Sequence, residues 1–552
     1  MKRCPECRRD YYDDTLLYCL DDGNALLEGP AMSEPPASAG GQFDDGPATA
    51  ILPAVDPAQI RTAILSDAGQ QGSAKSIAVL PFAHLSSDPD DEYFCDGLAE
   101  ELLNALARID GLKVAARTSA FSFKGKNANI SEIGKALNVN TVLEGSVRKS
   151  GNRLRITVQL VNAADGYHLW SERYDREMKD IFEVQDEITL AVVEVLKVKL
   201  LGALAPIEPP TRDTAAYELY LKGRSLLYQR GLSIAEAIDC FKQAVALDAE
   251  YAQAWAGLAD GYTTFGYSGY KRATEVMPLA LEAARKSLEL DPDLAEGHNA
   301  FACATMLYDL DYDLAEREFL RALELNPNYL QARAWYALFL LQWISARNAE
   351  AHEEILQMLE ADPLSGYANV IACFSCVSSG RISEAVEYGR LGVELDPKSY
   401  LALWSYSAAL SSDKQYEEAV TVAERALAIS GQHSWALMTL ASTYAAWGKP
   451  DKALAVFREL EARSMREHIQ PAMLTPAAAA VGEIDRAIEF AKQGIEDRDP
   501  IFVVLVRTWP DYDNIRTDTT KIGSLSSIPC LANSIARSNS PTAAAAGVSI
   551  PG

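Results

Sequence analysis

The sequence predicts a multidomain protein: a small zinc ribbon, then an α/β domain, then an all-α superhelical solenoid. Three observations lead to this prediction. Cysteines with knuckle spacing lie near the N-terminus, apolar runs with the periods of strands and of helices follow, and a proline-containing phrase then recurs every 34 to 36 residues. With 552 residues the chain is too long for one hydrophobic core, so several folding units are expected.

Residues 1–28 contain the candidate metal site. Cys4 and Cys7 form a Cys-x-x-Cys knuckle, Cys19 follows 12 residues later, and Asp22 stands where a second knuckle would place its last cysteine. Zinc binds four ligands in a tetrahedron and accepts thiolates and carboxylate oxygens. The segment resembles a zinc ribbon, and we predict that Cys4, Cys7, Cys19 and Asp22 hold a structural Zn²⁺, which would help a module with little core to fold. The alternative is a degenerate ribbon without metal.

Two segments lack the periodic apolar residues of a folded core. Residues 29–75 are rich in Pro, Gly, Ala and Asp, and we predict a flexible linker there. Residues 517–552 are rich in Ser, Ala, Thr and Pro, with few large apolar side chains, and we predict a disordered tail.

The segment 76–202 has the pattern of an α/β domain. Residues 76–82 form a short apolar run that predicts a buried strand. Residues 153–160 alternate polar and apolar side chains, which predicts a half-buried strand, and a closing helix is expected at 180–200.

Several single residues in this domain carry further predictions. Ser131 is the expected N-cap of an internal helix, because its hydroxyl can accept a hydrogen bond from the first turn. Gly97 and Gly145 are expected in turns, and these are the loops we would inspect for an unrecognised site. Acidic pairs such as Glu100-Glu101 are expected to be helix-start and surface charges.

Five motifs occur in order along this segment, at residues 77–82, 93–102, 142–148, 169–175 and 182–188. Together they resemble the TolB-like amino-terminal domain of bacterial signalling proteins. In similar proteins this domain precedes tetratricopeptide repeats and often follows an output module, such as a winged-helix DNA-binding domain, a cyclase or a serine/threonine kinase. We find no segment of those kinds in this sequence, so the resemblance implies a sensing or adaptor role.

Residues 215–500 are repetitive, and this is the strongest signal in the sequence. Prolines 292, 327, 363 and 397 close phrases such as Leu-Asp-Pro, and small residues precede each proline at helical spacing. A period near 34 built of two helices is the signature of tetratricopeptide (TPR) repeats. We predict about eight units, beginning near residues 217, 252, 295, 331, 366, 400, 434 and 471.

The second unit carries an insertion around residues 265–270, which are aromatic and Gly-rich. Two interpretations stay open for it: a contact for a partner protein, or a plain packing loop. Cys373 and Cys376 also have Cys-x-x-Cys spacing, but the repeat register places them at packing positions, so we expect buried free thiols. The tryptophans of the repeats are likewise expected in the core.

No motif for phosphate, dinucleotide or catalytic-metal binding occurs, and the six histidines are far apart in sequence. We therefore predict no catalytic and no cofactor-binding residues, and a protein that is not an enzyme. The net charge of −26 and the pI of about 4.7 make nucleic acid an unlikely partner. Without an apolar run of membrane-spanning length or a secretory signal, we expect a cytoplasmic location and no membrane association.

The sequence thus favours a non-enzymatic scaffold or signalling adaptor. Its partners would be proteins or peptides bound on the concave face that the first helices of the repeats form. Two alternatives stay open: a transcription or signalling regulator that contacts nucleic acid through the zinc ribbon, and an enzyme with an unrecognised site in the α/β domain.

Overall fold

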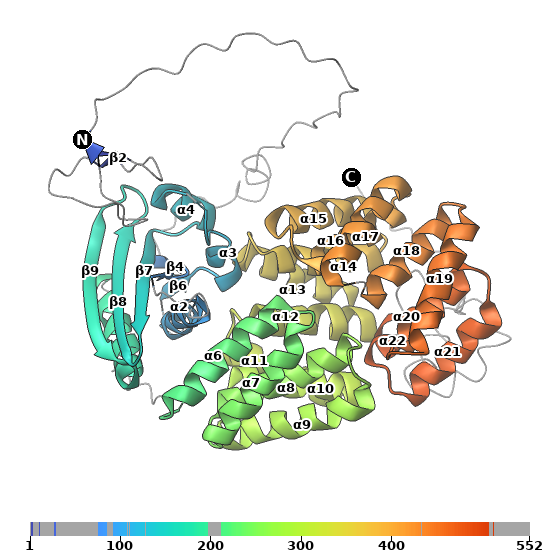
Figure 1. Cartoon of the computed structure of the whole chain (residues 1–552), viewed down its shortest axis with the longest axis horizontal. Helices are drawn as coiled ribbons and strands as arrows, with labels where there is room; N and C mark the ends of the chain where they lie inside the picture. Colours follow the sequence, from blue (N-terminus) through green and yellow to red (C-terminus); the bar gives the residue numbers. More distant parts are fainter. Residues whose placement is uncertain are drawn as a thin grey trace, which may run out of the picture. The chain divides into compact units, whose positions relative to one another are not determined.

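The computed structural model describes residues 75–85, 92–196 and 211–506 apart from 108, 110, 127 and 432, together with Tyr512 and three short N-terminal strands (Figure 1). The predicted zinc ligands Cys4, Cys7, Cys19 and Asp22 lie outside the described residues. The predicted tail, and the predicted linker up to residue 74, lie outside them as well. These predictions therefore stay predictions.

The three N-terminal strands form an antiparallel sheet in the order β2-β1-β3. They are β1 (Lys2–Arg3), β2 (Asp10–Tyr11) and β3 (Leu27–Glu28). This sheet belongs to the compact unit Met1–Gln71, and the other described residues belong to a second unit, Gly72–Gly552.

The second unit begins with a six-stranded mixed sheet of order β6-β4-β7-β8-β9, with β5 paired to β7. Strands β4, β6 and β7 are parallel, whereas β7, β8 and β9 form an antiparallel meander. The strands are β4 (Lys75–Val79), β5 (Ala83–His84), β6 (Leu112–Val114), β7 (Thr141–Ser150), β8 (Arg153–Asn162) and β9 (His168–Glu177).

The pattern of apolar and polar side chains along the strands explains which faces of the sheet are buried. Strand β4 is an apolar run buried on both faces, as expected for a central parallel strand. In β8, Leu154, Ile156, Val158 and Leu160 are buried between exposed or half-buried polar neighbours, which confirms the predicted alternation.

Helices cover both faces of the sheet. Helices α2 (Glu92–Ala107) and α5 (Ile181–Leu196) share one core with β8, while α3 (Arg117–Phe121) and α4 (Ile130–Leu137) cover the other face. The short 3-10 helix η2 (Met178–Asp180) leads into α5.

Helix α4 is capped differently from the prediction. Its N-cap is Asn129, whose side chain accepts a hydrogen bond from the Glu132 N–H while the Glu132 carboxylate accepts one from the Asn129 N–H. The prediction that Ser131 caps this helix is therefore wrong, because a complete capping box is available two residues earlier.

Eight antiparallel helix pairs follow within the described residues 214–496. The first two pairs are α6 (Thr214–Gln229) with α7 (Ser233–Leu247), and α8 (Ala252–Tyr267) with α9 (Ala273–Leu290). In the next two pairs the first helix continues as a π-helix: α10 (Ala295–Ala304) and η3 (Thr305–Asp309) pair with α11 (Tyr312–Leu325), and α12 (Leu330–Ala334) and η4 (Trp335–Ile344) pair with α13 (Asn348–Ala361). The last four pairs are α14 (Gly366–Ser378) with α15 (Ile382–Leu395), α16 (Tyr400–Ser412) with α17 (Tyr416–Ser430), α18 (Ser434–Ala446) with α19 (Pro450–Ser464), and α20 (Pro471–Ala480) with α21 (Ile484–Glu496).

Small residues let the helices of successive pairs approach closely. A Cβ atom added to Gly257 of α8 would lie 2.6 Å from the Phe241 ring of α7, and one added to Gly389 of α15 would lie 2.9 Å from the Tyr406 backbone of α16. The glycines therefore make room for large neighbours, as the repeat pattern predicts.

The first helices of successive pairs pack side by side, and their aromatic side chains form a continuous ladder. Trp335, Phe339, Trp343, Phe374, Trp404 and Trp435 contact one another in sequence and are all buried. The prediction that these tryptophans belong to the core is confirmed. Cys373 and Cys376 are buried free thiols, also as predicted.

The insertion at residues 265–270, which includes the end of α8, packs against this ladder. Tyr267 contacts Trp335, Phe339 and Trp435 at ring-centroid distances of 5.1 to 5.5 Å. Its carbonyl oxygen also accepts a hydrogen bond from Gln470 at 3.1 Å. Of the two interpretations of this segment, the structure supports the packing loop, which joins the second repeat to the seventh and eighth.

A short terminal helix, α22 (Pro500–Leu505), packs against the same ladder. Ile501, Phe502, Val504 and Leu505 are all buried, and α22 contacts α8, η3, η4 and α20. Asp499 caps this helix through the N–H groups of Ile501 and Phe502. Residues of the chain itself thus cover the apolar ladder.

Candidate functional site at the domain interface

The α/β domain and the first repeat share one hydrophobic core. Helix α2 packs on α6, and Tyr217, Tyr220 and Leu221 of α6 belong to the same buried cluster as the sheet. A Cβ atom added to Gly97 of α2 would lie 2.7 Å from the Leu221 side chain, so the glycine permits this close contact.

The two glycines expected in turns are in regular structure. Gly97 lies inside α2, and Gly145 lies inside β7, where an added Cβ would be 2.7 Å from the Thr157 carbonyl oxygen. The prediction that they lie in turns is therefore wrong, because both positions are needed for close packing within regular elements.

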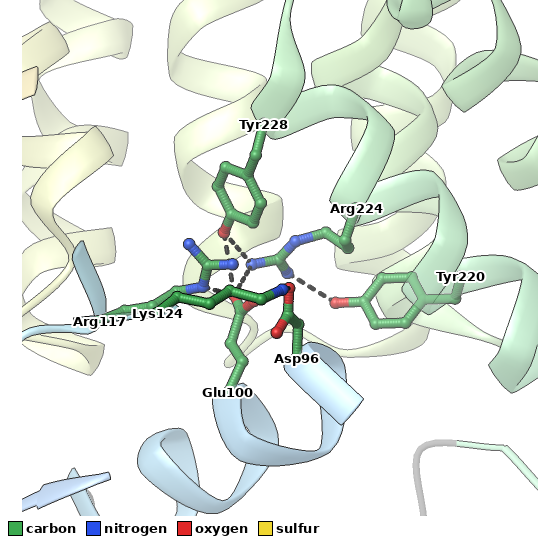
Figure 2. Close-up of polar contacts among 7 residues, drawn as sticks. All are labelled: Asp96, Glu100, Arg117, Lys124, Tyr220, Arg224 and Tyr228. Carbon is green, nitrogen blue, oxygen red and sulfur yellow. Dashed lines mark hydrogen bonds and ion pairs between the residues drawn. The ribbon is translucent and has the colours of Figure 1, made fainter. Parts of the chain in front are cut away.

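A buried polar network crosses this interface, and Glu100 of α2 is its centre (Figure 2). Arg117 Nε lies 2.8 Å from Glu100 Oε2, and Arg224 Nη2 lies 2.5 Å from Glu100 Oε1. The Tyr228 hydroxyl donates to the same Oε1 at 2.9 Å, and Arg224 also donates to Tyr220 at 2.7 Å. One carboxylate thus holds two guanidinium groups, one from each domain.

The neighbouring positive charges explain why the Glu100 carboxylate is stable in its ionised form although the residue is buried. Burial alone would raise the pKa of Glu100, but Arg117 and Arg224, with the Tyr228 hydrogen bond, outweigh burial and hold its pKa below the usual range. The Arg117 guanidinium also stacks over the rings of Phe121 and Tyr228 at 4.2 and 4.3 Å. Removing Glu100 would leave two buried like charges, which is strongly destabilising.

Lys124 and Asp96 lie beside this network in Figure 2. Lys124 Nζ is 2.6 Å from Asp96 and 2.7 Å from Glu92, so the turn after α3 is bound to the start of α2. Burial raises the pKa of Asp96 even though Lys124 opposes this. The pair fixes α3 relative to α2 and thereby helps to orient Arg117.

A second interface contact involves Asp362, in the turn between α13 and α14. Asp362 Oδ1 accepts a hydrogen bond from the Ser119 backbone N–H at 2.9 Å, and the Thr118 and Ser119 hydroxyls also donate to this carboxylate. Ser119 Oγ in turn accepts from the Leu364 N–H at 2.9 Å. The Leu364 side chain packs against the core on that face of the α/β domain.

Asp362 is fully buried, and this burial raises its pKa to about 6. The matching residues of the second and third repeats, Asp291 and Asn326, instead accept hydrogen bonds from backbone N–H groups of their own turns. The fourth turn therefore differs because the α/β domain covers it. The α/β domain contacts the repeats in two separate places, at α6 and at this turn.

Sequence reasoning missed both contacts. Glu100 was expected to be a surface charge, and that expectation is wrong, since the residue is 7% exposed and lies within α2. One signal could have indicated the interface: Tyr217, Tyr220, Arg224 and Tyr228 form a stripe at helical spacing on α6. Such a stripe of amphipathic side chains is typical of a covered helix face.

Neither a metal centre nor a membrane span is found within the described part of the chain. No group of three or more His, Cys, Asp or Glu side chains there could hold a metal ion. None of the helices described is long and apolar enough to cross a membrane.

Comparison with known families identifies the two regions. Residues 73–190 match the second domain of HilA/YgeH-like transcriptional regulators, so the α/β domain is similar to that domain and not, as predicted, to a TolB-like domain. Residues 410–474 match the tetratricopeptide repeat, which confirms the predicted TPR region.

A curated relative corrects the prediction that the protein is not an enzyme. The chain is 38% identical over 237 residues to a protein of Rhizobium meliloti (strain 1021) named "Putative adenylate cyclase 3". That match covers 42% of this chain and 40% of the relative, so the chain spans well under half of the relative's length. A relationship to a protein with an enzyme's name contradicts the non-enzymatic prediction.

Two solved structures have distant similarity to this chain. The Cut9–Hcn1 hetero-tetramer of the APC/C is 15% identical, with a TM-score of 0.38, and the match covers 56% of this chain and 54% of that one. YrrB, a TPR protein described as having an unusual peptide-binding site, is 18% identical, with a TM-score of 0.24 and coverage of 36% and 95%.

Proposed function

We propose that this chain is the regulatory region of a signalling protein, in which the TPR repeats bind a partner protein and the α/β domain responds to that binding. One observation carries the proposal: the α/β domain is attached to the repeats at two places, through Glu100 to α6 and through Ser119 to Asp362. Three complete helix pairs lie between these attachment points.

The double attachment supports a coupling between the repeats and the α/β domain. In a solenoid each repeat contacts mainly its neighbours, so small rotations between repeats add up along the array. A partner that changes those rotations would move Asp362 relative to Arg224. The α/β domain could then keep only one of its two attachments, and the partner would favour its partial release.

The inner face of the repeats is where we place the partner. Its aromatic ladder is apolar, and the chain's own α22 and Tyr267 cover it. A partner with a short apolar helix would compete with α22 for that surface. Competition of this kind keeps the free protein's surface covered until a partner is present.

Reciprocity provides the test. If a partner weakens the Asp362 contact, then weakening that contact by mutation must strengthen partner binding by the same factor. The full chain, Asp362→Ala and the matched control Asp396→Ala are immobilised and exposed to native lysate. Asp396 occupies the corresponding position of the next repeat and is exposed.

The proposal expects a protein that is retained more strongly by Asp362→Ala than by either the wild type or Asp396→Ala. A partner retained equally by all three chains would show that the α/β domain does not respond to the repeats. Such a result would leave partner binding intact and overturn the coupling.

The relative named as an adenylate cyclase supports a second candidate function, in which the chain takes part in forming cyclic AMP from ATP. The test incubates the purified full chain with ATP and either Mg²⁺ or Mn²⁺ and measures cyclic AMP. Product above that of a heat-inactivated sample would support this candidate, and an equal amount in both would count against it.

A further inference from the structure

Strand β9 is the outer strand of the six-stranded sheet. It is ten residues long, and no strand among the described residues pairs with its outer edge. An edge of this length presents a row of backbone N–H and C=O groups that can pair with another strand. Tyr167 and Leu169, at the start of the strand, are 75% and 44% exposed, so apolar surface adjoins this edge.

The middle of β9 has a charge pattern that is complementary to itself. The segment reads Glu172, Arg173, Tyr174, Asp175, Arg176. When a second copy runs antiparallel with the two-fold axis at Tyr174, Glu172 stands opposite Arg176 of the other copy and Arg173 stands opposite Asp175. Each pair occurs twice because of the symmetry, so four opposite-charge pairs flank the axis.

This register also satisfies the geometry of the strand. Residues of the two copies that face each other must point to the same side of the sheet, and pairs such as 172 with 176 meet that condition. If the two-fold axis lay one residue away, at Arg173 or at Asp175, the charged residue on the axis would face the same residue of the other copy. The charges therefore favour one register around Tyr174 over its neighbours.

Charged side chains also protect edges from unwanted pairing, so their contacts within the chain matter here. Arg173 is 65% exposed, and its ion pair with Asp175 is long, at 3.7 Å. Arg176 lies 3.4 Å from Glu187 of α5, and both side chains are exposed. Glu172 accepts a hydrogen bond from the Tyr174 hydroxyl at 3.2 Å, and Asp175 lies 3.1 Å from Arg155 of β8. Of these contacts only that of Asp175 joins β9 to a neighbouring strand, so the charges are available to a second copy.

We propose that two copies of this chain associate through antiparallel pairing of their β9 edges, with Tyr174 at the two-fold axis. The result is one continuous sheet to which each copy contributes its six strands. The partner is therefore a second copy of the same chain, recognised by backbone hydrogen bonds and by the alternating charges of residues 172–176. This association goes beyond the proposed partner binding by the repeats and does not depend on it.

The test measures the oligomeric state of the full chain by sedimentation velocity over a range of concentrations. Glu172→Arg places like charges opposite each other on both sides of the axis, so the dimer's Kd should rise by about tenfold or more. The double variant Glu172→Arg with Arg176→Glu restores opposite charges and should return the Kd to near that of the wild type. Glu353→Arg makes the same charge change on an exposed position of α13 and should have no effect.

Three results would overturn the proposal. The wild-type chain could sediment as a monomer up to ~100 µM, where even a weak specific complex is populated. A dimer could form but remain unaffected by Glu172→Arg, which would place its interface elsewhere. The double variant could also fail to recover the dimer although its circular dichroism matches that of the wild type. If Glu172→Arg does not fold, Arg173→Asp replaces it, since it opposes two aspartates across the same axis.

Discussion

The Asp362 carboxylate accepts a hydrogen bond from the Ser119 backbone N–H at 2.9 Å, across 243 positions of the chain. Asp362 belongs to the Asp-Pro turn that closes the fourth repeat, and Ser119 belongs to the short helix α3 of the α/β domain. The Asp-Pro turn recurs because it ends the second helix of a repeat, and in the fourth repeat the same turn also attaches the α/β domain.

The Asp362 contact should depend on pH. Burial raises the pKa of Asp362 to about 6 from an ordinary value of 3.8, so the folded state binds this proton more tightly than the unfolded state. Stability contributed by the group is therefore greatest below pH 4 and is lost as the pH rises through about 6, by roughly 3 kcal/mol in total.

The measurement compares urea unfolding of the wild type and of Asp362→Asn at pH 5 and at pH 7. Asp499 has a pKa raised to about 6 by burial and adds a dependence of the same sign, so only the difference between the two proteins isolates Asp362. The wild type should lose more stability than Asp362→Asn between these pH values. Equal losses would show that the Asp362 carboxylate does not titrate in this range.

Replacing Glu100 should be costly. Glu100→Gln removes the negative charge between Arg117 and Arg224 and leaves two guanidinium groups in a buried site. We expect a loss of about 3–5 kcal/mol in the free energy of unfolding, measured with urea. Glu194→Gln, on an exposed position of α5, serves as the control and should change stability by less than about 0.5 kcal/mol.

A double variant tests whether the charge network causes the loss. Glu100→Gln together with Arg224→Gln removes one charge of each sign, so it should destabilise the protein by less than the sum of the two single variants. Strict additivity would mean that the two residues do not interact.

Periodic features were predictable from the sequence, and specific pairings between distant residues were not. Prolines 292, 327, 363 and 397 mark the ends of second helices, because proline cannot continue a helix, and this local rule gave the repeats their register. The polar and apolar alternation of β8 likewise follows from its position between a core and solvent.

No periodic pattern in the sequence marks the interface between the α/β domain and the repeats. Glu100 resembles any helix-surface acid until Arg224 is brought to it from 124 positions away. The same holds for Asp362, whose sequence context matches that of the other turns. The sequence predicted a partner on the concave face that the first helices form, but it gave no sign of α22, because the burial of this helix depends on where the chain returns after Asp499.

Gly257 should tolerate no side chain. An added Cβ would lie 2.6 Å from the Phe241 ring, which is itself fully buried and unable to move aside. Gly257→Ala should lower the free energy of unfolding by about 1–3 kcal/mol, although alanine is the better helix former. Combining it with Phe241→Leu should cost less than the sum of the two changes. A neutral Gly257→Ala would mean that the first two repeats pack less closely.

The zinc prediction can be settled by metal analysis. If Cys4, Cys7, Cys19 and Asp22 bind Zn²⁺, the purified chain should contain about one zinc ion per chain, and removal with a chelator should not change the helical signal of the repeats. Cys4→Ser with Cys7→Ser should abolish the zinc content. Zinc at the same level in that variant would exclude these ligands.

The last prediction follows from the way in which α22 covers the aromatic ladder. Phe502 is fully buried within a helix of six residues, which is too short to be stable without its contacts. Phe502→Ala should therefore release α22 and expose part of the ladder, so that the dye ANS binds and fluoresces. The helical circular dichroism should stay nearly unchanged, because the eight helix pairs do not depend on α22. Phe490→Ala, on the half-buried face of α21, should produce no comparable fluorescence. If Phe502→Ala binds no more dye than the control, the inner face is not an accessible apolar surface, and competition between α22 and a partner would be excluded.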